Sequence, residues 1–229
     1  MDRDDPGYRG QSDYNAAFLA IYDPLVLGLF ARFVWRCPST ELVAGYRQHI
    51  RDPHLDVGPG TGYFLRAAGL SLGSRVTLLD PNPNVLRHAS RRLRHLDVTS
   101  IEADVLKPLP VDGPFESAAL HGVLHCLPGP SSRKAAAVAN IASVLSPTGV
   151  LFGASVLGRT GTHSWLARRF LAVLNRRGTF DNLEDSEESL RLMLEASFEQ
   201  VELETVGSFA LFTARGPRTG RSPDLTGDR

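Results

Sequence analysis

A glycine-rich turn after a short apolar strand carries the clearest chemical signature in the sequence. Leu55-Asp56-Val57 has the pattern of a strand, residues 58–62 form the turn, and Tyr63-Phe64-Leu65 begin an amphipathic helix. Glycines let backbone N–H groups approach a ligand closely, and the helix N-terminus adds a favourable field. The pattern therefore predicts a nucleotide pocket built on Gly58, Gly60 and Gly62.

The acidic residue beside this turn limits the kind of nucleotide that the pocket can hold. Asp56 lies at the end of the strand, where its carboxylate would repel a diphosphate but could hold an ammonium group. An NAD-dependent oxidoreductase is therefore disfavoured. A tight strand-to-helix turn without a ligand is the alternative for the same residues.

Other polar side chains follow the later strands. They are Asp80, Asp104, His121 and His125. Ligands in open α/β sheets bind outside the C-terminal ends of the strands, so these residues are expected at the same edge of the sheet as the glycine turn.

The elements that must position these residues alternate between strand and helix from His54 onward, which predicts a mostly parallel sheet. The expected strands cover residues 54–57, 75–80, 99–102, 115–120, 150–155, 201–206 and 209–214. Helices are expected from about Gly62, after a cap at Asn82, from about Ser131, and over residues 184–197. Only Gly207 and Ser208 separate the last two strands, so these should form a hairpin with an antiparallel strand.

A single domain is expected over residues 13–214. Residues 13–50 should form N-terminal helices that act as a lid, with Ser39 as the N-cap of a helix over residues 41–50. A helical insertion is expected over residues 156–182. Residues 1–12 and 216–229 are rich in Gly, Pro, Asp and Arg and are expected to be disordered.

The Asp-x-Gly-x-Gly-x-Gly pattern of residues 56–62 resembles the first motif of the class I S-adenosylmethionine-dependent methyltransferases. The resemblance covers about residues 14–214. It implies an α/β, Rossmann-like seven-stranded methyltransferase fold with a C-terminal antiparallel hairpin and N-terminal helices. The stretches around Tyr22 and Trp35 and residues 124–129 are similar to a subgroup of small bacterial and fungal enzymes associated with secondary metabolism.

The resemblance implies S-adenosylmethionine as cofactor, with S-adenosylhomocysteine as its product, and assigns roles to single residues. Asp56 and the glycines would hold the methionine part, Asp80 would accept hydrogen bonds from the ribose hydroxyls, and Asp104 would bind the adenine amine. Asp80 could equally cap a turn or helix, and Asp104 could be an ordinary loop residue. The complete cofactor-binding set implied is Tyr22, Asp56, Gly58, Gly60, Gly62, Asp80, Asn82, Asp104, Val105, Leu120 and His121.

Two histidines, His121 and His125, are the candidate catalytic residues. A neutral imidazole can take a proton from a hydroxyl or heterocyclic N–H as the acceptor attacks the methyl group. His121 could instead contact the cofactor through its backbone, and His125 could cap the following turn. Methyl transfer can also proceed by proximity and orientation without a base.

Composition narrows the possible partners. Lys plus Arg and Asp plus Glu both number 25, so no basic surplus indicates binding to nucleic acid or to an anionic membrane. Two cysteines cannot form a zinc cage, and no metal site is expected. No stretch approaches the ~20 apolar residues of a membrane span. The N-terminus lacks the apolar core of a signal peptide, which favours the cytoplasm. A monomer or homodimer is expected.

Together, these features predict an S-adenosylmethionine-dependent methyltransferase that acts by an SN2 step on a small, aromatic or apolar, natural-product-like acceptor. Two alternatives stay open. One is a cyclase or pericyclase that binds the same cofactor without methyl transfer, and the other is a catalytically silent partner of another enzyme.

Overall fold

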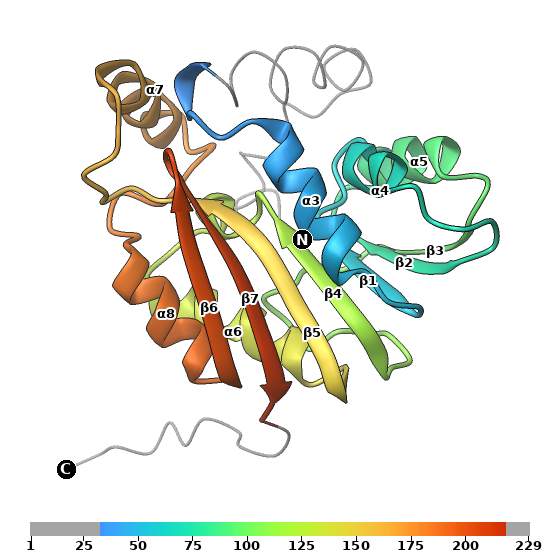
Figure 1. Cartoon of the computed structure of the whole chain (residues 1–229). Helices are drawn as coiled ribbons and strands as arrows, with labels where there is room; N and C mark the ends of the chain where they lie inside the picture. The colour runs from blue at the N-terminus through green and yellow to red at the C-terminus, as the bar shows by residue number, and fades with distance from the viewer. Residues whose placement is uncertain (1–32, 219–229) are drawn as a thin grey trace.

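A seven-stranded sheet organises residues 33–218, the part of the chain that the computed structural model describes (Figure 1). From edge to edge its strands are β3 (Asp97–Ile101), β2 (Arg75–Leu79), β1 (His54–Val57), β4 (Phe115–His121), β5 (Leu145–Val156), β7 (Phe209–Pro217) and β6 (Phe198–Val206). β7 runs antiparallel to both neighbours, and the other described pairs are parallel. This architecture confirms the predicted mostly parallel sheet with a C-terminal hairpin. Predictions that concern residues 1–32, including Tyr22, and residues 219–229 lie outside the described residues.

Four strands, β3, β5, β6 and β7, extend more than one residue beyond their predicted bounds, and β6 begins at Phe198 rather than at Val201. β3 begins at Asp97 because it pairs with the whole of β2. β5 begins at Leu145, which pairs with Phe115, and the register shifts before the next pair, Ser117 with Val150, so the residues between Leu145 and Val150 form an irregularity inside the strand. β7 continues to Pro217, which pairs with Phe198 at the start of β6. The prediction of a disordered tail from residue 216 was therefore wrong for Gly216 and Pro217, which belong to the strand. Each extension follows from pairing with a neighbouring strand.

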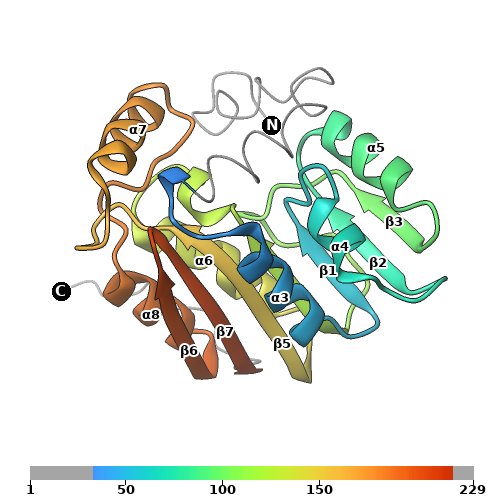
Figure 2. The ribbon, with the colours of Figure 1, turned by 45° about the horizontal axis from the view of Figure 1, so that its top comes forward.

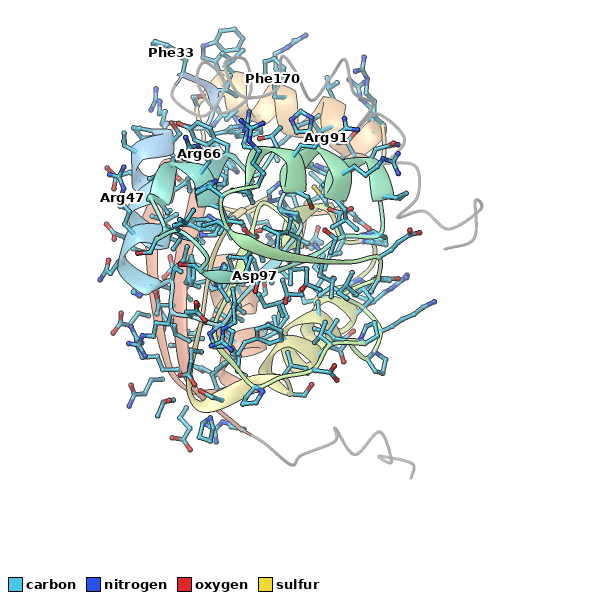
Figure 3. The ribbon with its side chains drawn as sticks, turned by 90° about the vertical axis from the view of Figure 1, so that its right-hand side faces the viewer. Phe33, Arg47, Arg66, Arg91, Asp97 and Phe170 are labelled. Carbon is cyan, nitrogen blue, oxygen red and sulfur yellow. The ribbon has the colours of Figure 1, made fainter. Side chains whose placement is uncertain are left out.

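Helices cover both faces of the sheet (Figures 1 and 2). On one face lie α3 (Ser39–His49), α4 (Tyr63–Ala68) and α5 (Pro83–Arg92), and on the other lie α6 (Ser131–Ala142) and α8 (Glu187–Glu195). α7 (Trp165–Arg176) lies near the end of the sheet where β6 and β7 are joined. Figure 3 looks onto the β3 edge and labels Arg91 on α5 and Asp97 at the start of the strand.

Side chains alternate across the sheet and fill two cores. Leu120 of β4 belongs to the core under α6 and α8, whereas Phe152 of β5 packs with Tyr46 of α3 on the opposite face. Because successive strand residues point to opposite faces, His121 faces α3 while Leu120 faces α6. Any contact between Leu120 and a ligand at the sheet edge would therefore use its backbone.

The sequence predicts N-caps at Asn82 and at Ser39, and the structure shows both helix starts. The Asn82 side chain accepts a hydrogen bond from the Asn84 N–H at 2.9 Å, and Pro83 is the first residue of α5, so the cap at Asn82 is confirmed. The prediction for Ser39 was wrong. Ser39 is already helical, and the N-cap is Pro38, whose carbonyl accepts the Glu41 N–H at 3.0 Å. The proline fixes the extended backbone that precedes the helix.

Two segments meet at the turn between β6 and β7. The Ser208 N–H donates to the Trp35 carbonyl at 2.8 Å, and the Ser208 hydroxyl lies 2.9 Å from Nδ1 of His163. A Cβ on Gly207 would lie only 2.2 Å from the Trp35 oxygen. These contacts fix the segment before α3 and the segment before α7 at the same end of the sheet.

Candidate active site

The glycine turn after β1 has the backbone that its sequence predicts. Gly58, Gly60 and Gly62 have φ values of 67°, 54° and 73°, in the left-handed region that favours glycine. A Cβ on Gly58 would lie 2.4 Å from Cγ2 of Val123, so this position is packed. A Cβ on Gly60 would meet no heavy atom of the described residues within 4 Å. The space beside Gly60 is therefore open with respect to the described residues.

Asp56 is buried beside this turn with few partners. Its side chain is on the α3 face, and the Tyr46 hydroxyl lies 3.3 Å from each carboxylate oxygen. Burial raises the pKa of Asp56 to about 8; the Tyr46 hydrogen bond opposes this shift and the nearby Asp80 adds to it. A cation at this position would stabilise the charged carboxylate.

Asp80 follows β2 and helps to shape the next turn. Its Oδ1 accepts the Asn82 N–H at 2.7 Å. Within residues 33–218, its second carboxylate oxygen has no hydrogen-bond partner. Burial raises the pKa of Asp80 to about 7, and the Asn82 hydrogen bond acts in the opposite direction. One carboxylate oxygen of Asp80 therefore stabilises the local turn, and the other is available to a hydrogen-bond donor from a ligand.

Asp104 lies in the loop after β3. Its Oδ1 accepts the Leu106 N–H at 3.0 Å, which stabilises the turn. Val105 is buried, and its carbonyl accepts a hydrogen bond from the Asn140 side chain at 2.9 Å. These hydrogen bonds hold Asp104 in a fixed loop. The same is expected if Asp104 is an ordinary loop residue.

His121 ends β4 and is buried without polar partners. Neither ring nitrogen has a hydrogen-bond partner among the described residues. Its ring centroid lies 4.7 Å from that of Tyr46 and 5.7 Å from that of Phe64. Burial lowers the pKa of His121 to about 3, helped by the nearby His54 and His49, so the ring is neutral at pH 7. A buried ring with two unpaired nitrogens is expected to meet a polar ligand.

His125 has a different environment. It lies in the short 3₁₀ helix η2 (Leu124–Cys126), where its Nδ1 accepts the Val156 N–H at 3.0 Å. Because a backbone N–H can only donate, Nδ1 must be unprotonated, and the neutral ring carries its proton on Nε2. Its ring packs 4.3 Å from Phe180. Burial, and secondarily Lys134, lowers the pKa of His125 to about 3. The structure thus places the two histidines among different neighbours.

A cleft of about 840 Å³ lies between α7 and the segment that follows β4. Its lining includes Cys126, Pro128, Arg169, Val173, Arg176 and Phe180. Burial raises the pKa of the Cys126 thiol to about 12, so it is not a thiolate nucleophile. The cleft combines apolar walls with arginine side chains.

Two buried polar residues were not singled out from the sequence. Tyr46 contacts Asp56, and the Lys134 ammonium lies 2.6 Å from Asp185 Oδ2. Both occupy the inner faces of predicted helices, Tyr46 beside Leu42 and Lys134 four residues before Val138. That helical spacing was the signal available in the sequence.

Residues 33–218 contain neither a candidate metal cluster nor a candidate membrane-spanning helix. No group of three or more His, Cys, Asp or Glu side chains could hold a metal ion in this part of the chain. No helix in the same range is long and apolar enough to cross a membrane.

Comparison with known proteins identifies the family. Residues 55–151 match a family model described as a methyltransferase domain. The physcion biosynthesis cluster O-methyltransferase of Aspergillus chevalieri is 37% identical over 93% of this chain and 97% of that protein. The N-methyltransferase vrtF of Penicillium aethiopicum is 38% identical over 80% of this chain and 78% of that protein.

A solved structure supports the fold. The N-methyltransferase NodS from Bradyrhizobium japonicum WM9, in complex with S-adenosylhomocysteine, aligns over 93% of this chain and 100% of that chain with a TM-score of 0.63 and 18% identity. This likeness confirms the fold, and the relatives above 35% identity confirm the predicted enzyme class. The chain belongs to the class I S-adenosylmethionine-dependent methyltransferases.

Proposed function

We propose that this enzyme methylates an oxygen or nitrogen atom of a small, aromatic or apolar, natural-product-like molecule. The names of its relatives support this acceptor class, since one belongs to physcion biosynthesis and both transfer methyl groups to oxygen or nitrogen. The observation that carries the proposal is the pair of incompletely partnered carboxylates, Asp56 and Asp80, which lie at the C-terminal ends of the neighbouring parallel strands β1 and β2.

The chemistry of these residues fits the cofactor. The buried Asp56 carboxylate accepts only a long, shared hydrogen bond and can take further donors from the primary ammonium. The second oxygen of Asp80 can accept from a ribose hydroxyl, and Gly60 lets the backbone approach the ligand. Asp104 and the Val105 backbone N–H are the proposed adenine contacts. The remaining cofactor contacts in this proposal are Gly58, Gly62, Asn82, the Leu120 backbone, His121 and Tyr22.

The chemistry that S-adenosylmethionine supplies when bound is a methyl group on a positively charged sulfur. We assign His121 the task of accepting a hydrogen bond from the acceptor hydroxyl or N–H, because both ring nitrogens lack described partners. Its lowered pKa makes the ring a weak base, so orientation of the acceptor is the larger part of this role. A base role for His125 stays a prediction, and its occupied Nδ1 argues against it.

We place the remote part of the acceptor in the cleft beside α7, and its reacting atom outside that lining, next to His121. Cys126 and Pro128, in the wall of the cleft, come shortly after the end of β4, and ligands in such sheets bind beyond the C-terminal ends of the strands. Phe180 and Val173 offer apolar contact to an aromatic ring. A monomeric or homodimeric state, a cytoplasmic location, one domain over residues 13–214 and a lid formed by residues 13–50 stay predictions from the sequence.

The direct test is methyl transfer from tritium-labelled S-adenosylmethionine to a panel of phenols and N-heterocycles. The proposal expects labelled product with at least one acceptor, and a large loss of product for Asp80→Asn. Cofactor binding without product from any acceptor would favour the cyclase alternative. Absence of binding would favour the silent partner.

A further inference from the structure

Tyr46 is the one described residue whose hydroxyl contacts the Asp56 carboxylate. It lies on α3, its side chain is only 2% exposed, and its oxygen is 3.3 Å from both Oδ1 and Oδ2. A typical O–H···O bond is about 2.5–3.0 Å long. The hydroxyl is therefore shared between two oxygens and leaves each with unused accepting capacity.

Three other elements fix the direction of this hydroxyl. The Tyr46 ring stacks on Phe64 of α4 at 5.4 Å and 15°. It meets Phe152 of β5 edge-on at 5.2 Å and 90°, and lies 4.7 Å from His121 of β4. Such aromatic packing restricts the ring to one orientation. Tyr46 therefore contacts Asp56 from the α3 side. The remaining lone pairs of the two carboxylate oxygens are available to hydrogen-bond donors on the other sides.

We propose that Tyr46 is a positioning residue that orients the Asp56 carboxylate toward the primary ammonium of the cofactor's amino-acid part. This inference rests on the proposed function, because it takes Asp56 as the site of that ammonium. Tyr46 itself acts through Asp56. Neither the nucleoside part of the cofactor nor the acceptor is involved in this contact.

Tyr46 also affects the charge state of Asp56. Asp56 interacts with Tyr46 from α3 and with Asp80 from the end of β2, and the rings of His121 from β4 and His54 from β1 pack against Tyr46. The Tyr46 hydrogen bond lowers the pKa of Asp56 against the effect of burial. Its removal should raise that pKa further, so the carboxylate would need a higher pH to become charged and bind the ammonium.

A calorimetric titration with two ligands tests this role. S-Adenosylhomocysteine carries the amino-acid group, whereas 5′-methylthioadenosine keeps the nucleoside and thioether but lacks the ammonium. Tyr46→Phe should weaken S-adenosylhomocysteine about tenfold, the loss expected for one hydrogen bond to a charged group, and change 5′-methylthioadenosine less than twofold. The pH dependence of S-adenosylhomocysteine binding should move to higher pH in the variant.

Asp56→Asn provides the matched arm of a double-mutant cycle. With the carboxylate replaced by an amide, addition of Tyr46→Phe should change the affinity for S-adenosylhomocysteine less than twofold. Equal weakening of both ligands by Tyr46→Phe, no weakening of either, or failure of this variant to fold would each overturn the inference. If the wild-type protein binds neither ligand, it is the proposed function that fails.

Discussion

The Nδ1 atom of His125 accepts a hydrogen bond from the Val156 N–H at 3.0 Å, and this contact joins the loop after β4 to the end of β5. The ring is also held by Phe180 at 4.3 Å. His125 is thereby fixed in one neutral tautomer. The contact assigns the residue a structural task that its position in the sequence did not indicate.

Substitution of His125 should separate this structural task from a role as base. Asn places an acceptor oxygen near the position of Nδ1, so His125→Asn should retain most of the stability and the affinity for S-adenosylhomocysteine. His125→Leu leaves a buried N–H unpaired and should lower the free energy of unfolding by about 1–3 kcal/mol. Urea denaturation of both variants measures the difference. Equal destabilisation by Asn and Leu would contradict the assigned contact.

The buried lysine on α6 should be important for stability. The Lys134 ammonium lies 2.6 Å from Asp185 Oδ2 and 2.5 Å from the Asp181 carbonyl oxygen. Lys134→Met leaves the partly buried Asp185 without its cation, and should cost about 3–5 kcal/mol of unfolding free energy. Lys107→Met, at an exposed lysine, is the matched control and should change stability by less than about 0.5 kcal/mol. Similar denaturation midpoints for the two variants would count against the ion pair.

Two glycines of the turn should respond differently to alanine. Gly58→Ala forces a Cβ against Val123, so it should destabilise the fold, and Val123→Ala should partly restore it. Gly60→Ala has room for the Cβ but adds the backbone strain of positive φ, of about 1 kcal/mol. Its larger effect should be on the affinity for S-adenosylhomocysteine. Thermal melts measure the stability of both variants, and calorimetry measures their affinity for S-adenosylhomocysteine. Wild-type affinity of Gly60→Ala for this ligand would refute the predicted contrast.

The ligand-free protein should be most stable near pH 6.5. Burial lowers the pKa of His54, His121 and His125 to about 3, so below their usual value the unfolded chain binds three more protons than the folded chain. The pKa values of Asp56 and Asp80 are raised to about 8 and 7, so in this range the folded chain binds two protons that the unfolded chain does not. These two protons oppose the effect of the histidines. For these five groups alone, the net loss on acidification is about 1.4 kcal/mol per pH unit. Burial also lowers the pKa of His49 and His163, which adds to this loss, and raises the pKa of Asp185, which opposes it.

Above pH 6.5 the histidines no longer contribute to this dependence, whereas the two aspartates lose protons in the folded state. The free energy of unfolding should therefore fall again as the pH rises toward 8. Urea denaturation between pH 5 and 8.5 provides the measurement. A free energy of unfolding that rises steadily across this range would contradict the assigned burial of Asp56 and Asp80. In Asp56→Asn, the fall in stability between pH 6.5 and 8 should be smaller than in the wild-type protein.

Local patterns in the sequence were sufficient to locate the glycine turn and the strand-end acids. The strand, turn and helix around Asp56 are contiguous, and the alternation of elements determines which edge of the sheet carries Asp80. Long-range contacts could not be predicted in the same way. The Tyr46–Asp56 hydrogen bond depends on how α3 crosses the sheet, and the bond from Val156 to His125 joins residues 31 positions apart.

The boundary at Ser39 was missed for a related reason. Serine is a common N-cap, but the preceding proline already supplies the extended backbone and the carbonyl that begin α3. Competition between two local signals decided that helix start. The extensions of β3, β5, β6 and β7 depended instead on strand pairing, which is not encoded locally.

If Asp56 and Asp80 form the binding site for S-adenosylmethionine, calorimetric titration with S-adenosylhomocysteine will show it. We expect micromolar binding to the wild-type protein, at least tenfold weaker binding to Asp80→Asn, and no binding of NAD. Wild-type affinity that is unchanged in Asp80→Asn and in Asp56→Asn would contradict this assignment of the two residues.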